Sequence, residues 1–349
     1  MMGVRGAFTG VDWLGWGGVG GCSGIDAYCP QGALFHPTLG TWTAVATAGA
    51  PAGRDQHGVA AIPGGVLVWG GRGTDLASRN DGAIYDPGSD SWTPVLSQGA
   101  PTSRYAAFSF ATKTEVVIWG GVHSSDGKSA SMASDGAAYD FTTRTWRPLS
   151  TAGAPSPRSA EAIVATGADI LVWSGIADDG NPLGSNVLAD GGVYHLATDT
   201  WEPISSVGAP PARMNPVTLW TGSEMLVFGG MGCGGRQNGI FVVCQDAGFA
   251  YNPATRRWRT ITAGLAPRSG AIAAWTGSRA FIWGGIGSCC AGYDCRCTDG
   301  GLYDPASDSW QAVVPDGSPI GDGTAYWIGD SVLVISNLGP PGRYFPPSK

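Results

Sequence analysis

The stretch Val66-Leu67-Val68-Trp69-Gly70-Gly71 recurs along the chain and decides the fold. An apolar run that ends in paired glycines indicates a buried β-strand followed by a tight turn, because glycine tolerates positive φ. The residues aligned with Trp69 lie 53, 50, 54, 55, 55 and 52 positions apart. They are Trp16, Trp69, Trp119, Trp173, Phe228, Trp283 and Ile335. Seven copies at this period predict a repeat architecture.

A second repeated feature is a pair of aromatic residues seven positions apart. Tyr85 and Trp92 illustrate it, and the segment between them, Asp86-Pro87-Gly88-Ser89-Asp90, consists of turn-forming residues. The pattern predicts a β-hairpin with one aromatic side chain on each arm. Another short strand, such as Gly58-Val59-Ala60-Ala61, precedes each run that ends in glycines. The six aromatic pairs are Phe35 and Trp42, Tyr85 and Trp92, Tyr139 and Trp146, Tyr194 and Trp201, Tyr251 and Trp258, and Tyr303 and Trp310.

Each unit is therefore predicted to contain four short antiparallel strands, as one propeller blade does. The paired glycines after the second strand, the tyrosine of the third and the tryptophan of the fourth resemble the kelch family of β-propellers. The resemblance covers nearly the whole chain, from about Gly6 to Phe345. It implies an all-β, kelch-type β-propeller of four-stranded antiparallel blades, in one domain over residues 1–349. Eleven of the 15 tryptophans occupy the two repeat positions, so we expect them in the core.

Seven blades are the preferred interpretation, since there are seven second strands and, with Tyr344, seven third-strand aromatics. This interpretation needs a short first strand near Arg5 to Thr9 and an incomplete final blade. Six blades with overlapping termini are the alternative, because only six fourth-strand tryptophans occur. The approximate repeat units are 4–45, 54–95, 104–149, 158–204, 213–261, 268–313 and 322–346.

The composition restricts both the fold and the partners. The chain has 57 glycines, 24 prolines and only 13% charged residues, which excludes coiled coils, collagen and chains disordered by charge repulsion. A net charge of −7 and the lack of a cationic cluster argue against nucleic acid binding. No apolar run reaches the roughly 18 residues that span a bilayer. Residues 1–10 are not basic or apolar enough for a signal peptide.

Length variation is confined to one class of loop. From each fourth-strand tryptophan to the next second-strand anchor the distance is 25 or 27 residues. From that anchor to the third-strand aromatic it is 19, 16, 20, 21, 23, 20 and 9 residues. Antiparallel geometry places these variable loops on the same face as the connections between units. Variable loops on a rigid scaffold usually carry binding or catalysis, so this face is the candidate functional surface.

The cysteines all lie in these loops, two or four to a loop. An even number in each loop favours local disulfides, because these can staple irregular segments that have little core. Zinc is the alternative, but a single Cys-x₂₋₄-Cys spacing and two adjacent cysteines do not suit a tetrahedral site, so no metal is expected. Disulfides imply an extracellular, periplasmic or cell-surface location. The cysteines are Cys22, Cys29, Cys233, Cys244, Cys289, Cys290, Cys295 and Cys297.

An arginine lies 15 residues before the second-strand anchor in five units. These residues start the innermost strand, so we expect them at the mouth of the channel, where converging guanidinium groups could bind an anion. They resemble arginines of kelch domains that bind acidic peptides, which implies the same use. The alternative is internal ion pairing, because an aspartate precedes the third-strand aromatic in each of these units. The pairs are Arg54 with Asp81, Arg104 with Asp135, Arg158 with Asp190, Arg213 with Asp246, and Arg268 with Asp299.

The sequence offers only weak candidates for catalytic residues. Of the four histidines, His123 in a variable loop and His57 at a first strand could face the channel mouth, whereas His36 and His195 follow third-strand aromatics. Two histidines of unknown proximity do not define a copper site, so no cofactor is expected. Acids that could serve a sugar-acid mutarotase or lyase are Asp75, Asp126, Glu161, Asp178 and Asp179, for which solvated loop tips are the simpler explanation.

Three functions follow from the sequence. The first is a secreted or surface-displayed binding module, a monomeric ring that captures a protein or glycan through the variable-loop face. An anionic ligand is one option, and the ligand-binding candidates are His123 and the five arginines. The second is a carbohydrate-active enzyme of the mutarotase or lyase type. The third is a structural module of a larger assembly.

Overall fold

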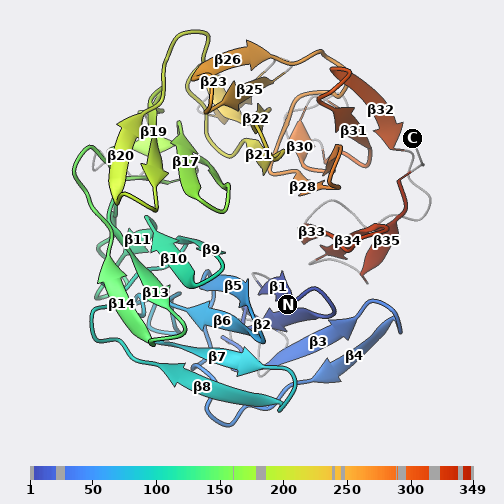
Figure 1. The fold of residues 1–349 in the computed structure, drawn as a ribbon. Coiled ribbons are helices and arrows are strands. Elements are labelled where there is room, and N and C mark those ends of the chain that lie inside the picture. Colours follow the sequence, from blue (N-terminus) through green and yellow to red (C-terminus); the bar gives the residue numbers. More distant parts are fainter. Residues whose placement is uncertain are drawn as a thin grey trace. The chain divides into compact units, whose positions relative to one another are not determined.

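The computed structural model describes residues 4–20, 28–159, 161–177, 186–237, 240–244, 248–287, 289, 296–313, 323–336 and 341–346. Every regular element in this part of the chain is a β-strand. The strands form seven antiparallel blade sheets (Figure 1), so the preferred interpretation is confirmed and the six-bladed alternative is wrong. By its contacts the chain divides into two compact units. Unit 1 comprises Met1–Ser159 and Ala197–Thr200, and unit 2 comprises Ala160–Leu196 and Trp201–Lys349.

Unit 1 contains the first three blades. Blade 1 is β1 (Arg5–Phe8), β2 (Trp13–Trp16), β3 (Gly32–His36) and β4 (Thr41–Ala44). Blade 2 is β5 (Gly58–Ile62), β6 (Gly65–Trp69), β7 (Gly82–Asp86) and β8 (Ser91–Val95). Blade 3 is β9 (Phe108–Ala111), β10 (Glu115–Trp119), β13 (Gly136–Asp140) and β14 (Thr145–Pro148), and its loop holds the small hairpin β11 (Val122–His123) and β12 (Ser131–Met132). The two-residue β15 (Arg158–Ser159) follows.

Blades 4 to 7 come next along the chain. Blade 4 is β16 (Ala162–Ala165), β17 (Asp169–Trp173), β19 (Gly191–His195) and β20 (Thr200–Pro203). Blade 5 is β21 (Val217–Trp220), β22 (Met225–Phe228), β25 (Phe249–Asn252) and β26 (Arg257–Thr260). Blade 6 is β28 (Ile272–Trp275), β29 (Ala280–Trp283), β31 (Gly300–Asp304) and β32 (Ser309–Val313). Blade 7 has three described strands, β33 (Gly323–Trp327), β34 (Val332–Ser336) and β35 (Gly342–Tyr344).

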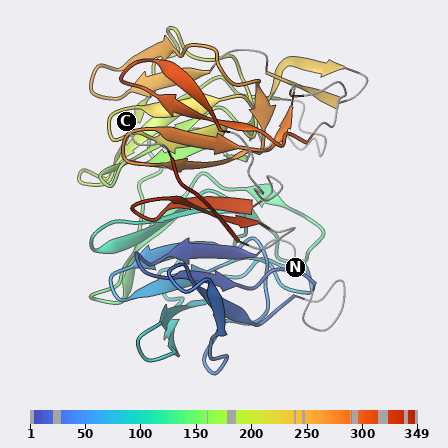
Figure 2. The ribbon, with the colours of Figure 1, turned by 90° about the vertical axis from the view of Figure 1, so that its right-hand side faces the viewer.

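Short strands also occur outside the blade sheets of unit 2. Those in the variable loops are β18 (Ile176–Ala177), β23 (Met231–Gln237), β24 (Ile240–Val243) and β30 (Ile286–Gly287), and β27 (Arg268–Ser269) lies in the connection between blades 5 and 6. The β23–β24 hairpin projects beyond the blade sheets of its unit (Figure 2).

The cores lie between neighbouring blades, as the buried faces of their sheets require. One cluster combines Leu14 and Trp16 of blade 1 with Val66 and Val68 of blade 2, and the others join blades 2 and 3, 4 and 5, 5 and 6, and 6 and 7 in the same way. The predicted hairpin is confirmed, since each third-strand aromatic ring lies 5.0–5.1 Å from its tryptophan partner in all six pairs.

The tryptophans of the second and fourth strands fasten one blade to the next. The Trp16 ring packs 4.6 Å from that of Trp92, and Trp69 packs 5.5 Å from Trp146. The indole of the fourth-strand tryptophan also donates a hydrogen bond to the preceding blade. Trp146 Nε1 donates to the carbonyl of Leu96, which directly follows β8 of blade 2, at 2.9 Å. Trp92, Trp258 and Trp310 donate equivalent bonds at 2.7–2.8 Å.

Trp42 departs from the expectation that all repeat tryptophans are core residues. It is 46% exposed, whereas Trp92 is 7% exposed. The ring contacts described for Trp42 are with Trp13 and Phe35 of its own sheet, whereas Trp92 also stacks on Trp16 of the neighbouring blade.

Candidate functional site

The repeated arginines lie inside the protein. They stand at or just before the innermost strands, and their exposed fractions are 0–1%. Because a guanidinium group cannot lose its proton, each buried one must find hydrogen-bond acceptors. The five are Arg54, Arg104, Arg158, Arg213 and Arg268.

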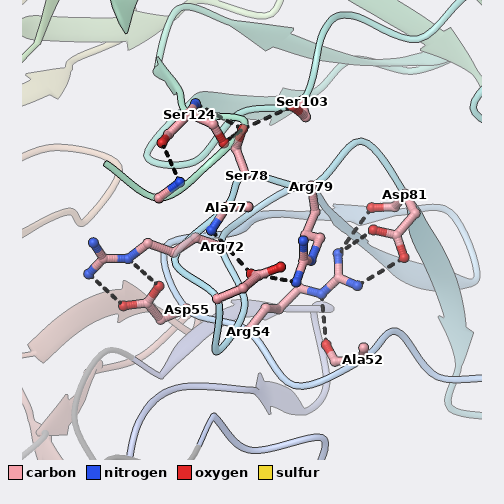
Figure 3. Close-up of polar contacts among 12 residues, drawn as sticks. Ala52, Arg54, Asp55, Arg72, Ala77, Ser78, Arg79, Asp81, Ser103 and Ser124 are labelled. Atoms are coloured by element: carbon pink, nitrogen blue, oxygen red, sulfur yellow. Dashed lines mark hydrogen bonds and ion pairs between the residues drawn. The ribbon is translucent and has the colours of Figure 1, made fainter. Parts of the chain in front are cut away.

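Arg54 shows how the chain supplies those acceptors (Figure 3). Its Nε donates to the carbonyl of Ala52 at 2.8 Å, and Nη1 donates to the carbonyl of Gly70 at 2.9 Å. The two terminal nitrogens donate to the carboxylate of Asp81 at 3.0 and 2.9 Å. Burial alone would raise the pKa of Asp81, but the hydrogen bonds and charge of Arg54 hold it below its ordinary value. The guanidinium thus ties the glycine turn of its blade to the segment before the third strand.

The same arrangement recurs in two other blades. Arg104 donates to the carbonyl of Gly120 and to the Asp135 carboxylate, both at 3.0 Å. Arg268 donates to the Asp299 carboxylate at 2.9 Å and to the carbonyl of Gly284 at 3.2 Å. Burial lowers the pKa of Arg104, and the charge of Asp135 opposes this.

The contacts described for the remaining two arginines follow the same pattern. Arg158 Nε donates to the carbonyl of Ser156 at 2.9 Å. Arg213 donates to the carbonyl of Gly229 at 2.9 Å and stacks on Phe249 at 5.4 Å. Its predicted partner Asp246 lies outside the described residues.

The backbone of these arginines joins neighbouring blades. The second glycine of one blade donates its N–H to the carbonyl of the next arginine, as Gly18 does to Arg54 at 2.9 Å and Gly71 does to Arg104 at 2.8 Å. Gly71 has a φ of 93°, and a Cβ there would approach the carbonyl oxygen of Asp55 to 2.6 Å. Internal ion pairing is thus the arrangement at Arg54, Arg104 and Arg268. An anion-binding role for the five arginines stays a prediction.

The variable loops and the connections between blades share one face in unit 1, as predicted. Ser78 of the blade 2 loop and Ser124 of the blade 3 loop are joined by Ser78 N–H donating to the Ser124 carbonyl at 2.7 Å. Ser78 Oγ also lies 2.9 Å from Ser103 Oγ, in the connection between the two blades (Figure 3).

His123 belongs to this serine cluster. Its Nδ1 lies 2.7 Å from the carbonyl oxygen of Ser103, which can only accept, so Nδ1 carries the proton. The other ring nitrogen, Nε2, is then a hydrogen-bond acceptor in the neutral ring. The ring is partly exposed, and thus offers this acceptor on the loop face.

Arg72 is a partly exposed cation on the same face. Its Nε and Nη2 donate to the two carboxylate oxygens of Asp55 at 2.9 and 3.1 Å, and its guanidinium lies 5.3 Å from the centre of the Tyr105 ring. These hydrogen bonds raise the pKa of Arg72. The Arg72 side chain is 29% exposed, against 1% for Arg54.

Sequence reasoning missed Arg72, although a signal was present. The residue after the paired glycines is apolar in the other units with that motif, for example Val122 and Met231, and only here is it charged. We define the loop surface of unit 1 by Arg72, Leu76, Tyr105 and His123. Leu76 is 45% exposed and adds an apolar group, so the surface combines a cation, an acceptor, an aromatic ring and an aliphatic side chain.

Two of the acids proposed for catalysis, Asp75 and Asp126, have local structural partners. Asp75 accepts a hydrogen bond from Arg79 Nη2 at 2.7 Å, and this bond lowers its pKa. Asp126 accepts bonds from the N–H groups of Lys128 and Ser129, which lower its pKa. Asp178 and Asp179 lie outside the described residues. His57 is fully buried, and neither ring nitrogen has a hydrogen-bond partner.

Two predicted disulfides can be assigned. Cys233 pairs with Cys244, with the Cα atoms 5.2 Å apart, and Cys289 pairs with Cys297 at 5.6 Å. The first bond connects the strands of the β23–β24 hairpin. Cys29 is also disulfide-bonded, whereas Cys22, Cys290 and Cys295 lie outside the described residues. Cys289, Cys297 and Asp299 lie close together, but the disulfide consumes both thiols, so this group is not a metal site.

Comparison with known proteins agrees with the repeat pattern. No helix in the described part of the chain is long and apolar enough to cross a membrane. A family model described as the KLHDC2/KLHL20/DRC7 kelch-repeats domain matches residues 12–230 and 111–336. An adagio-like protein 2 of Oryza sativa subsp. japonica is 30% identical over 142 residues, which are 39% of this chain and 21% of that protein. The chain thus covers about a fifth of that relative. Two overlapping matches that together span most of the chain show that it belongs to the KLHDC2/KLHL20/DRC7 kelch-repeat domain family.

Proposed function

We propose that this kelch propeller binds a partner protein through the loop surface of unit 1, and that the partner contributes a segment with a carboxylate and an apolar side chain. Kelch propellers are generally protein-binding modules. The observation that carries the proposal is Arg72, whose side chain stays 29% exposed beside its partner Asp55, whereas Arg54, Arg104 and Arg268 are buried and paired with aspartates.

The chemistry of the surface supports this ligand class. Asp55 occupies one edge of the Arg72 guanidinium, and no bond is described for Nη1, which can donate to a carboxylate of the partner. Tyr105 lies next to the charge, and tyrosine and arginine are residue types enriched in binding hot spots. Leu76 adds apolar contact area. His123 Nε2 can accept a hydrogen bond from a backbone or side-chain donor of the same segment.

The test is a selection of displayed random peptides on the immobilised protein. We expect enrichment of peptides that combine acidic and apolar residues, and about tenfold weaker binding of the selected peptides to Arg72→Ala, as for a lost charged hydrogen bond. The matched control is Arg147→Ala. Arg147 makes the same two-bond contact with a carboxylate, Glu115, at 2.8 Å, but in the fourth strand. Equal binding by both variants would contradict the proposal.

The proposed setting is an oxidising compartment. The support is the two assigned disulfides, because such bonds persist mainly outside the reducing cytosol. Alkylation in denaturant followed by mass spectrometry tests it on protein isolated from its native source. Cys233, Cys244, Cys289 and Cys297 should stay unlabelled until a reductant is added, and labelling without reductant would contradict the proposal.

A further inference from the structure

In the part of the chain that the structure describes, blade 7 lacks the fourth strand that covers the third strand of the other six blades. Its described strands form the sheet β33-β34-β35, whereas each of the others continues to a fourth strand. β35 pairs with β34 along one side, where Val332 is opposite Tyr344. Its other side has no strand among the described residues (Figure 1). An edge strand with unpaired N–H and C=O groups is a template for another strand.

The other blades show which side chain fills the corresponding place. Tyr85 in β7 is the counterpart of Tyr344, because each is paired with the first residue of an apolar second-strand run, Val66 or Val332. On its other side Tyr85 is opposite Trp92, with the rings 5.0 Å apart. The chain therefore contains six examples of an aromatic residue opposite the third-strand aromatic.

The prolines of the fourth strands show which backbone groups face the third strand. Pro94 and Pro148 stand two positions after the tryptophan, opposite Ala83 and Ala137. Proline has no N–H, so at an edge it occupies positions whose N–H would point away from the sheet. The N–H of the residue directly after the tryptophan must then face the third strand. In blade 7 that residue would be opposite Arg343.

Arg343 gives this edge a charge preference. The side chain lies on the exposed strand surface, with Nη2 2.8 Å from an Asp330 carboxylate oxygen that is itself in an exposed side chain, and Nε 3.0 Å from Ser331 Oγ. Phe345, 60% exposed, lies 5.0 Å from the guanidinium. An acidic residue next to Arg343 is favourable, and a basic one is not.

We propose that the open edge of β35 binds an extended segment of a partner protein as an antiparallel fourth strand, with an aromatic residue opposite Tyr344 and an acidic residue opposite Arg343. Backbone hydrogen bonds would hold the segment, and the two side chains would select it. This site is separate from the loop surface of unit 1.

A peptide that copies residues 198–204, Thr-Asp-Thr-Trp-Glu-Pro-Ile, carries the required order of aromatic, acidic residue and proline. Its binding to the 349-residue protein can be measured by fluorescence anisotropy. We expect N-methylation of the glutamate to weaken binding about tenfold, as for a lost ladder bond. N-methylation of the tryptophan, whose N–H points outward, should leave affinity unchanged and is the matched control. Failure to bind at about 1 mM peptide, or equal effects of the two methylations, would overturn the proposal.

Variants of the protein locate the site. Arg343→Glu should weaken binding about fivefold, a charge effect of about 1 kcal/mol, while Arg343→Lys should retain most of it. A photo-crosslinking residue in place of the peptide tryptophan should attach to residues 342–346. This test uses the wild-type protein, so it does not depend on the folding of any variant. Attachment elsewhere would overturn the proposal. Arg72→Ala should bind this peptide normally, so failure of the loop-surface proposal would not affect this result.

Discussion

Replacing Arg54 with methionine tests the structural role of the buried arginines. Methionine keeps an aliphatic stem of similar length but leaves the carbonyls of Ala52 and Gly70 without their donor, and it removes the two bonds to Asp81. Removing one member of a buried ion pair costs about 3–5 kcal/mol. The Asp81 side chain is 56% exposed and can be rehydrated, so we expect the lower end, about 3 kcal/mol.

The assay is equilibrium unfolding in urea, followed by tryptophan fluorescence. Arg79→Met is the matched control. Arg79 lies in the same loop as Asp81 and forms an ion pair with Asp75, but both side chains of this pair are substantially exposed, at 31% and 56%. Its loss should cost less than about 0.5 kcal/mol. If Arg54→Met unfolds at the same urea concentration as Arg79→Met, the interpretation of Arg54 as a structural lock is wrong.

Three further predictions concern the core and the loops. Burial, followed by the charges of Arg5 and Arg54, holds the pKa of His57 well below 6.5, so below that pH the unfolded chain binds the proton first. The free energy of unfolding of the wild type should therefore fall between pH 6.5 and 5 by more than that of His57→Ala, a substitution that matches Ala107 of blade 3. Parallel curves in urea titrations over this pH range would contradict this. Trp146→Phe loses the hydrogen bond to Leu96 and should lower the free energy of unfolding by about 1–2 kcal/mol. Trp42→Phe, at the exposed equivalent position, should lower it by less than about 0.5 kcal/mol. Equal losses in thermal unfolding would show that Trp146 does not fasten one blade to the next. Replacing Cys233 and Cys244 together by serine should speed limited proteolysis within residues 231–244 and leave the blades resistant, and cleavage inside the blades would argue against a local staple.

The blade architecture could be predicted because it depends on periodic local patterns. An apolar run, two glycines and an aromatic pair seven residues apart determine strands, turns and their register, and Tyr85 and Trp92 pair as that spacing requires. The assigned disulfides could be predicted as pairs within a loop because each variable loop that contains cysteines contains an even number of them.

The direction of side chains at the loop face could not be predicted in this way. An arginine at the start of an inner strand can point to solvent or back to its own blade, and only the carbonyls around Arg54 decide between the two. The Arg–Asp spacing therefore left two alternatives open. The burial of Trp42 was misjudged because its repeat position is the same as that of Trp92, while of the two only Trp92 stacks on a tryptophan of a second blade in unit 1.

Hydrogen exchange with and without a selected acidic peptide tests the central claim, that ligand binding occurs at the loop surface of unit 1. Binding there should slow exchange only within residues 72–79, 103–105 and 122–127. Protection located only in other loops or in the fourth strands, with these three segments unchanged, would contradict it.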